Sequence, residues 1–176
     1  MQNKWKKLII VGAVQVLVAG VFTAKKLSEA PSAQSSPTEG TIPFETTSFD
    51  MDKLTSYGLP IMLDFGSESC GPCQQMKPAL TAMYEEMDGK VVIQYADVWE
   101  NPEAAQEYPV QVIPTQAFYD KEGKPFVPSD SLSQQIGFTM YSHRETGEHL
   151  FTIHQGALTE EQMRAIFAEM GVKIDD

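Results

Sequence analysis

Two cysteines separated by a glycine and a proline constrain this chain more than any other feature of its sequence. Cys70 and Cys73 are the only cysteines among the 176 residues. If Cys70 precedes a helix and Cys73 lies in its first turn, the two sulfur atoms are close enough to bond. The positive end of the helix then stabilises a thiolate on Cys70 and lowers its pKa. Gly71 permits a tight turn, and Pro72 fits a first helical turn because its missing N–H costs nothing there.

This spacing predicts a cysteine pair that carries out thiol–disulfide exchange. A thiolate is the nucleophile in that reaction, so we expect Cys70 to attack a disulfide of a partner and form a mixed disulfide. Cys73 would then attack Cys70 and release the reduced partner.

Three other uses of the pair remain open on this evidence. A structural disulfide would close a very short loop, and such a loop stabilises a fold little. A zinc or copper site needs further ligands, and the other good candidates are His143, His149 and His154, at least 70 residues beyond Cys73. The two thiols could also be inert and buried.

The charge of the chain argues against one class of partner. The net charge is −11 at pH 7, and from Phe44 onward 22 acidic residues stand against 8 basic ones. A body this acidic repels phosphate backbones, so we expect no binding to nucleic acid.

The first 43 residues differ in composition from the rest. Leu8–Ala24 holds 17 residues without a charge and follows a short basic start. Its length suits either a signal-peptide core or a short membrane-spanning helix. We therefore expect residues 1–26 to be a signal anchor or signal peptide, with the lysine bias placing the N-terminus inside and the body outside. Residues 27–43 are rich in Pro, Ser, Thr and Gly and predict a flexible linker, and residues 44–176 would form the folded domain.

Hydrophobic periodicity predicts alternating helices and strands in that domain. The expected helices cover residues 48–58, 71–87 and 101–108, with a last helix starting at Thr159; the expected strands cover 60–66, 90–98 and 115–120, followed by a hairpin over 139–156. We expect Ser48 to cap the first helix, Gly58 to end it, and Thr159 to form a capping box with Gln162. The alternation predicts a parallel core with an antiparallel edge made by the hairpin.

Several segments together resemble the thioredoxin-fold proteins. LDFGSESCGPCQQMKP, Leu63–Pro78, resembles their active-site strand, loop and helix, and CGPC is identical to the thioredoxin motif. VIPT, residues 112–115, resembles the loop whose proline is cis, and HQGALTEEQM, residues 154–163, resembles the final strand and helix. The resemblance covers roughly residues 44–173. It implies an α/β thioredoxin fold, in which helices flank a central mixed β-sheet, with an insertion or extended hairpin before the last helix.

The resemblance also implies roles for single residues. Asp64 matches a buried aspartate that helps the second cysteine gain or lose a proton, and Pro78 matches a proline inside the active-site helix. Pro114 would lie against the cysteines, while the backbone of Ile113 would pair with a bound substrate strand. The expected substrate-binding residues are Ile113, Pro114, Gly71, Pro72 and Ser69.

Some positions depart from the family pattern. Ser69 and Gly66 stand where cytosolic thioredoxins commonly have Trp, which opens the rim around Cys70. Tyr95 or a neighbour stands where a lysine often lies near the buried aspartate. Residues 125–150 are longer than the ordinary link between the last two strands, and we interpret them as an inserted loop and lengthened hairpin that either select partners or decorate the sheet edge.

Together these features predict a membrane-tethered thiol–disulfide oxidoreductase on the bacterial cytoplasmic membrane, facing the periplasm or exterior. We expect it to be a monomer and to reduce protein disulfides, with cytochrome c maturation as one setting. It would need no metal or organic cofactor beyond the Cys70–Cys73 disulfide. The resemblance implies a membrane thiol electron carrier of the CcdA or DsbD type as its electron source. The alternatives are a disulfide oxidase or isomerase, and a metallochaperone that binds copper through Cys70, Cys73 and one histidine.

Overall fold

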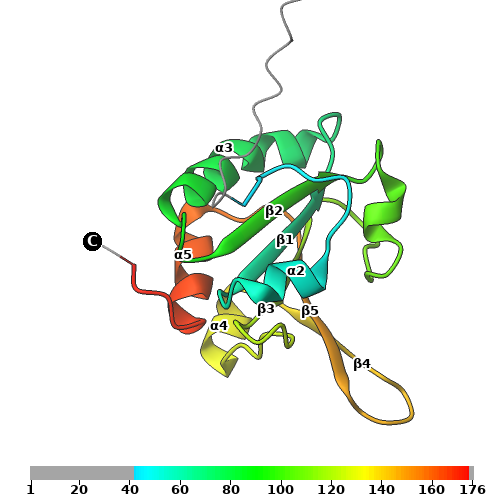
Figure 1. Cartoon of the computed structure of the whole chain (residues 1–176), viewed down its shortest axis with the longest axis vertical. Coiled ribbons are helices and arrows are strands. Elements are labelled where there is room, and N and C mark those ends of the chain that lie inside the picture. Colours follow the sequence, from blue (N-terminus) through cyan, green and yellow to red (C-terminus); the bar gives the residue numbers. More distant parts are fainter. Residues whose placement is uncertain (1–41, 175–176) are drawn as a thin grey trace, which may run out of the picture. The chain divides into compact units, whose positions relative to one another are not determined.

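A five-stranded mixed sheet organises residues 42–174, the part of the chain that the computed structural model describes. The strand order is β2-β1-β3-β5-β4, with helices on both faces (Figure 1). The strands are β1 (Ile61–Gly66), β2 (Val92–Asp97), β3 (Thr115–Tyr119), β4 (Thr139–Ser142) and β5 (His149–Gln155). The helices are α2 (Met51–Ser56), α3 (Gly71–Glu86), α4 (Asp130–Ile136) and α5 (Glu160–Glu169), with a 3-10 turn η1 (Pro102–Ala105).

Strand β1, which lies between β2 and β3, is buried along its whole length because both faces of the sheet are covered. Alternate side chains point to opposite faces of a strand. Ile61, Leu63 and Phe65 therefore pack in the cluster that contains Leu54 of α2. Met62 packs in the other cluster, whose members from α3 and α5 are Met76, Leu80, Met83, Met163, Ile166 and Phe167. Strands buried on both faces read as continuous apolar runs, which is why the sequence pattern located β1 correctly.

The prediction of a parallel core is only partly right. β1 and β2 are parallel, but β3 runs antiparallel to β1. The register pairs Phe65 with Thr115, so β3 starts at the end of the sheet where β1 and β2 finish. The connection 98–114 therefore stays at one end of the sheet. It needs only the short turn η1 rather than a full helix to carry the chain back.

Side-chain caps set the ends of the first and last helices. In α2 the cap is Asp50, whose carboxylate accepts a hydrogen bond of 3.0 Å from the Lys53 amide; the prediction of Ser48 as cap is wrong. A carboxylate directly before the first helical residue satisfies a free N–H and also meets the positive helix end. The predicted capping box of α5 is confirmed, with Thr159 and Gln162 exchanging hydrogen bonds of 3.2 and 2.9 Å.

The segment predicted as an inserted loop contains a helix, α4, which is a correction to the sequence analysis. Ser129 caps it by accepting from the Leu132 amide. The Ser129 hydroxyl also donates to Glu169 of α5 over 2.7 Å, which fixes α4 against the last helix. Beyond α4 the predicted hairpin is confirmed as β4 and β5, and it extends away from the rest of the domain (Figure 1).

The predicted anchor, residues 1–26, lies outside the described residues, as does most of the predicted linker. Within residues 42–174, none of the helices has the length and apolar character needed to span a bilayer.

Candidate active site

Cys70 and Cys73 lie at the N-terminus of α3, where the sequence analysis expects them. Cys70 is the N-cap residue with an extended backbone, and the amide of Cys73 donates to its Sγ over 3.3 Å. The two residues are joined by a disulfide, with Cα atoms 5.2 Å apart. Gly71 and Pro72 occupy the first two helical positions and are exposed, as is Ser69 just before the pair. A sulfur at a helix N-terminus is favoured as a thiolate, because it meets partial positive charge and an amide donor.

The loop before β3 brings a second predicted element to the cysteines. The Ile113–Pro114 peptide bond is cis, as the resemblance implies. The carbonyl oxygen of Ile113 lies 3.7 Å from Cys70 Sγ. Thr115 holds the turn by donating its hydroxyl to the Val112 carbonyl over 2.7 Å. The structure therefore places Ile113 and Pro114 beside Cys70, although they are more than 40 residues away in sequence.

Asp64 lies inside the protein, on the face of β1 that α3 and α5 cover. Its side chain is 3 % exposed, and burial raises its pKa from 3.8 to about 7 against the opposing effect of a hydrogen bond from Gln116. That bond joins Gln116 Nε2 to Asp64 Oδ1 over 2.8 Å. A carboxyl group with a pKa near neutrality can both take up and release a proton at ordinary pH.

Asp64 and Cys73 line the same small cavity behind the disulfide. Its volume is about 10 Å³, close to the smallest space that holds one water molecule. Asp64 Oδ2 and Cys73 Cβ both lie within 3.6 Å of the point that a Cβ on Gly66 would occupy. Asp64 is therefore on the Cys73 side of the disulfide, whereas the Ile113 carbonyl is on the Cys70 side.

Tyr95 and Lys77 explain two departures from the family pattern. A Cβ on Gly66 would lie 2.8 Å from the Tyr95 ring, so the tyrosine fills the space that a larger residue at position 66 would need. Tyr95 is also the Cα partner of Asp64 on β2. The Lys77 ammonium, from α3, lies 5.3 Å from the Tyr95 ring centroid and pairs with Glu68 and with Glu45. The positive charge near Tyr95 therefore comes from Lys77 on helix α3 and not from a lysine on strand β2.

The three histidines belong to the hairpin: His149 and His154 lie on β5, and His143 follows β4. His154 contacts the Gly137 carbonyl through Nδ1 over 2.8 Å, and His149 contacts Thr152 through Nε2 over 2.9 Å. His143 accepts from the Thr146 amide. In the described part of the chain, no group of three or more His, Cys, Asp or Glu residues is arranged to hold a metal ion.

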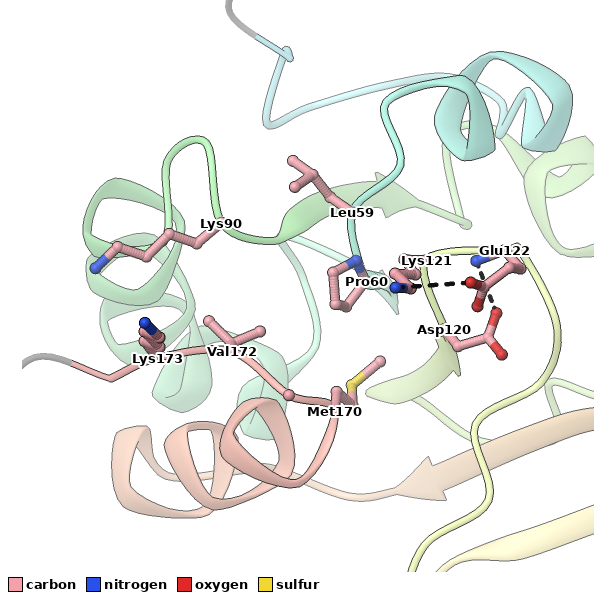
Figure 2. Close-up of a pocket in the computed structure, with 10 residues that line it drawn as sticks. Leu59, Pro60, Lys90, Asp120, Lys121, Glu122, Met170, Val172 and Lys173 are labelled. Atoms are coloured by element: carbon pink, nitrogen blue, oxygen red, sulfur yellow. Dashed lines mark hydrogen bonds and ion pairs between the residues drawn. The ribbon is translucent and has the colours of Figure 1, made fainter.

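A much larger hollow, of about 660 Å³, is lined in part by Leu59 and Pro60 (Figure 2). These two residues precede β1 and the cysteines follow it, so the hollow lies at the opposite end of that strand from the cysteines. Leu59 and Pro60, just before β1, and Val172, just after α5, form part of its wall. The charged residues Asp120 and Glu122 on its rim belong to one tight turn. It contains neither cysteine nor histidine, so it offers no group for thiol chemistry.

Comparison with known proteins decides the family. The family model described as Thioredoxin matches residues 41–136, more than half of the chain. The chain belongs to the thioredoxin family. As a member of this family it is a thiol–disulfide oxidoreductase, and Cys70 and Cys73 form its redox-active pair.

Curated bacterial thioredoxins are similar to the central part of this chain. That of Staphylococcus epidermidis is 34% identical over 98 residues, which are 52% of this chain and 92% of the relative. That of Staphylococcus aureus is 33% identical over the same length. That of Rickettsia conorii is 38% identical over 69 residues, and this match spans 65% of the relative's length.

Two solved thioredoxin structures are also similar at lower identity. Chloroplastic thioredoxin z is 23% identical, with a TM-score of 0.49 over 73% of this chain and 93% of the other. Fasciola hepatica thioredoxin is 24% identical, with a TM-score of 0.48 over 72% of this chain and 97% of the other.

Sequence reasoning did not find two residues that the structure brings to the site. Gln116 could have been noticed, because it is the one amide in the apolar run TQAFY and lies two residues after Pro114. Lys77 gave no comparable signal, since an exposed face of a helix commonly carries lysine.

Proposed function

We propose that this protein works outside the cytoplasm, tethered to the membrane by residues 1–26, and reduces disulfides of exported proteins, including those used in cytochrome c maturation. The observation that carries the reaction is the position of Cys70, which caps α3 beside the cis Ile113–Pro114 bond. The uncharged segment Leu8–Ala24 behind a basic start supports the location. A membrane thiol carrier would supply the electrons, and no metal or organic cofactor is required because the cysteine pair itself carries two electrons.

The reaction starts from the reduced pair. The Cys70 thiolate attacks one sulfur of the client disulfide, an S–S bond forms between Cys70 and the client, and the other client sulfur leaves as a thiolate. The helix N-terminus and the Cys73 amide stabilise the Cys70 thiolate before attack.

The second step releases the client. Cys73 loses its proton to Asp64 through the small cavity that both residues line. The Cys73 thiolate then bonds to Cys70 Sγ, and the Cys70–client bond breaks with its electron pair on the client sulfur. The client leaves with two thiols, and the protein is left with the Cys70–Cys73 disulfide. Asp64 acts as the base in this step because a pKa near 7 lets it accept the proton.

The client would lie along the loop before β3. The Ile113 carbonyl is next to Cys70, and its neighbour Val112 is 53% exposed. Trp99, just after β2, is 61% exposed. The backbone amides of Trp99 and of Glu68, in the loop before the cysteines, both donate to the carboxylate of Asp97. These two exposed apolar residues suit an extended client segment with apolar side chains near its cysteine.

Cell fractionation tests the location. In bacterial cells producing the full chain, we expect the protein to stay in the membrane pellet after an alkaline carbonate wash. Protease added to spheroplasts should remove the folded domain, because that domain faces outward. Deletion of residues 1–26 should make the protein soluble and protected from the protease. A full-length chain that is soluble, or one that is membrane-bound but protected in spheroplasts, would contradict the proposed location.

A further inference from the structure

Four side chains with polar groups form a row across the sheet, and two of them, Asp64 and Tyr95, line the small cavity together with Cys73. Tyr95 on β2, Asp64 on β1, Gln116 on β3 and His154 on β5 are successive Cα partners in the strand register. Residues directly opposite one another on neighbouring strands point to the same face. This is the face covered by α3 and α5, so Gln116 lies in the buried layer next to the proton-transfer group.

Gln116 is fully buried and has an unusual set of contacts. Its Nε2 donates to Asp64 Oδ1 over 2.8 Å, and the same nitrogen lies 3.5 Å from Met76 Sδ. Its Oε1 is buried and accepts no hydrogen bond within residues 42–174. A buried amide oxygen without a partner costs free energy, and such groups in native proteins call for an explanation. An apolar side chain would fill this place without that cost.

We infer that Gln116 is a positioning residue for Asp64 whose amide serves both protonation states of the carboxyl group. Nε2, which lies 2.8 Å from Asp64 Oδ1, donates to the ionised carboxylate. Oε1 is the spare acceptor for the O–H of the protonated carboxyl, reached by a half-turn of the amide about its terminal bond. The inference rests on the proposed role of Asp64 as the base in the release step.

Gln116 stabilises the ionised and the protonated carboxyl group of Asp64 to different extents. A hydrogen bond to a charged group is roughly twice as strong as one between neutral groups. Gln116 therefore favours the ionised carboxylate and keeps it able to accept the Cys73 proton at lower pH than burial alone would allow. The other titratable or charged groups that face this region are Tyr95 and Asp97 of β2, His154 of β5, Cys73 and Lys77 of α3, Glu68 of the preceding loop and Glu45 beside Tyr95.

The Cys73 step can be watched alone with 5,5′-dithiobis(2-nitrobenzoate) as the disulfide. Cys70 of the reduced protein attacks the reagent and releases a first thionitrobenzoate. Cys73 then gives its proton to Asp64 and bonds to Cys70 Sγ, and the second thionitrobenzoate leaves as a coloured thiolate with the electron pair of the broken bond. Stopped-flow absorbance separates the two phases, so the first phase serves as an internal control.

We expect Gln116→Met, which conserves volume and removes both ends of the amide, to leave the first phase unchanged. The apparent pKa of the second phase should rise by about one pH unit. This is the shift expected when the ionised carboxylate loses a charge-assisted hydrogen bond and gains no replacement. The second phase should then slow by up to about tenfold at pH 6 and recover at pH 9. Phe118→Leu is the matched control, because Phe118 is buried on the same face of β3 and has no contact with Asp64 in the hydrogen-bond network. It should lower stability without moving this pKa.

Two further measurements keep the inference separate from the proposed function. If Asp64→Asn leaves the rate and the pH profile of the second phase unchanged, Asp64 is not the base. The proposed role of Asp64 and the inference about Gln116 then both fail. If Asp64→Asn removes the profile while Gln116→Met keeps it, the inference about Gln116 alone is overturned. Should Gln116→Met not fold, the side-chain amide of Gln116 in the wild type can be followed by ¹⁵N NMR. Its Nε2 protons should titrate together with Asp64, and shifts that stay constant from pH 5 to 9 would overturn the inference.

Discussion

Replacing Cys73 with serine is expected to abolish turnover and to leave the protein joined to its client as a mixed disulfide. Cys70 can still attack a client disulfide, but no second thiol is present to break the mixed disulfide. Reduction of a protein disulfide such as those of insulin should therefore stop after one client per molecule. The product should be a covalent adduct on Cys70 that appears on non-reducing gels, disappears with dithiothreitol and is located by mass spectrometry.

The control variant is Cys70→Ser. It should trap no client, because Cys73 lines the cavity shared with Asp64, whereas the sulfur of Cys70 lies against the carbonyl group of Ile113 in the loop where the client binds. Exposure does not distinguish the two residues, which are 6% and 7% exposed, so the assignment depends on these contacts. Adducts on Cys73 in the Cys70→Ser protein, with none on Cys70 in the Cys73→Ser protein, would reverse the assigned roles.

The second large effect is on stability, through the buried charge of Asp64. In the unfolded chain this carboxyl ionises near pH 3.8, whereas in the fold its pKa is about 7 because it is buried. The folded state binds the proton more tightly. The stabilising contribution is therefore complete below about pH 4 and is lost as the pH rises through 7. A shift of about three units corresponds to about 4 kcal/mol.

Asp64→Asn should remove the loss of stability that accompanies a rise in pH, because an asparagine side chain stays neutral. Its Oδ1 can still accept the hydrogen bond from Gln116. The free energy of unfolding of the oxidised variant should match that of the wild type near pH 4 and exceed it by up to about 4 kcal/mol at pH 8. Urea denaturation at the two pH values measures this difference, and the other carboxylates cancel in the comparison. An equal difference at both pH values would show that Asp64 is not held with a raised pKa.

Local patterns in the sequence predicted the elements that carry the active site. The buried run of β1, the CGPC helix start, the Thr159 capping box and the hairpin each depend on residues close together in the chain, and each is found where expected. The resemblance added the cis bond before Pro114.

The features that were missed depend on contacts between distant residues. The alternation of helices and strands along the sequence does not show that β3 runs antiparallel to β1. The direction of β3 depends on the end of the sheet at which the chain enters that strand. Helix α4 is short, and the hydroxyl of its N-cap residue Ser129 donates to Glu169 of α5, 40 residues further along the chain. Gln116 contacts Asp64 only because the strand register places the two residues opposite each other. Lys77 reaches the site only because α3 places its ammonium group over the Tyr95 ring.

The reduction potential of the Cys70–Cys73 pair shows whether this protein reduces its clients or oxidises them. The full chain would be equilibrated with dithiothreitol or glutathione buffers, and the fraction of disulfide read by thiol alkylation and mass spectrometry. We predict a potential near the thioredoxin value, roughly −270 mV, which requires electrons to be supplied by a partner. A potential near that of a disulfide donor, roughly −120 mV, would contradict the account and make the protein an oxidase.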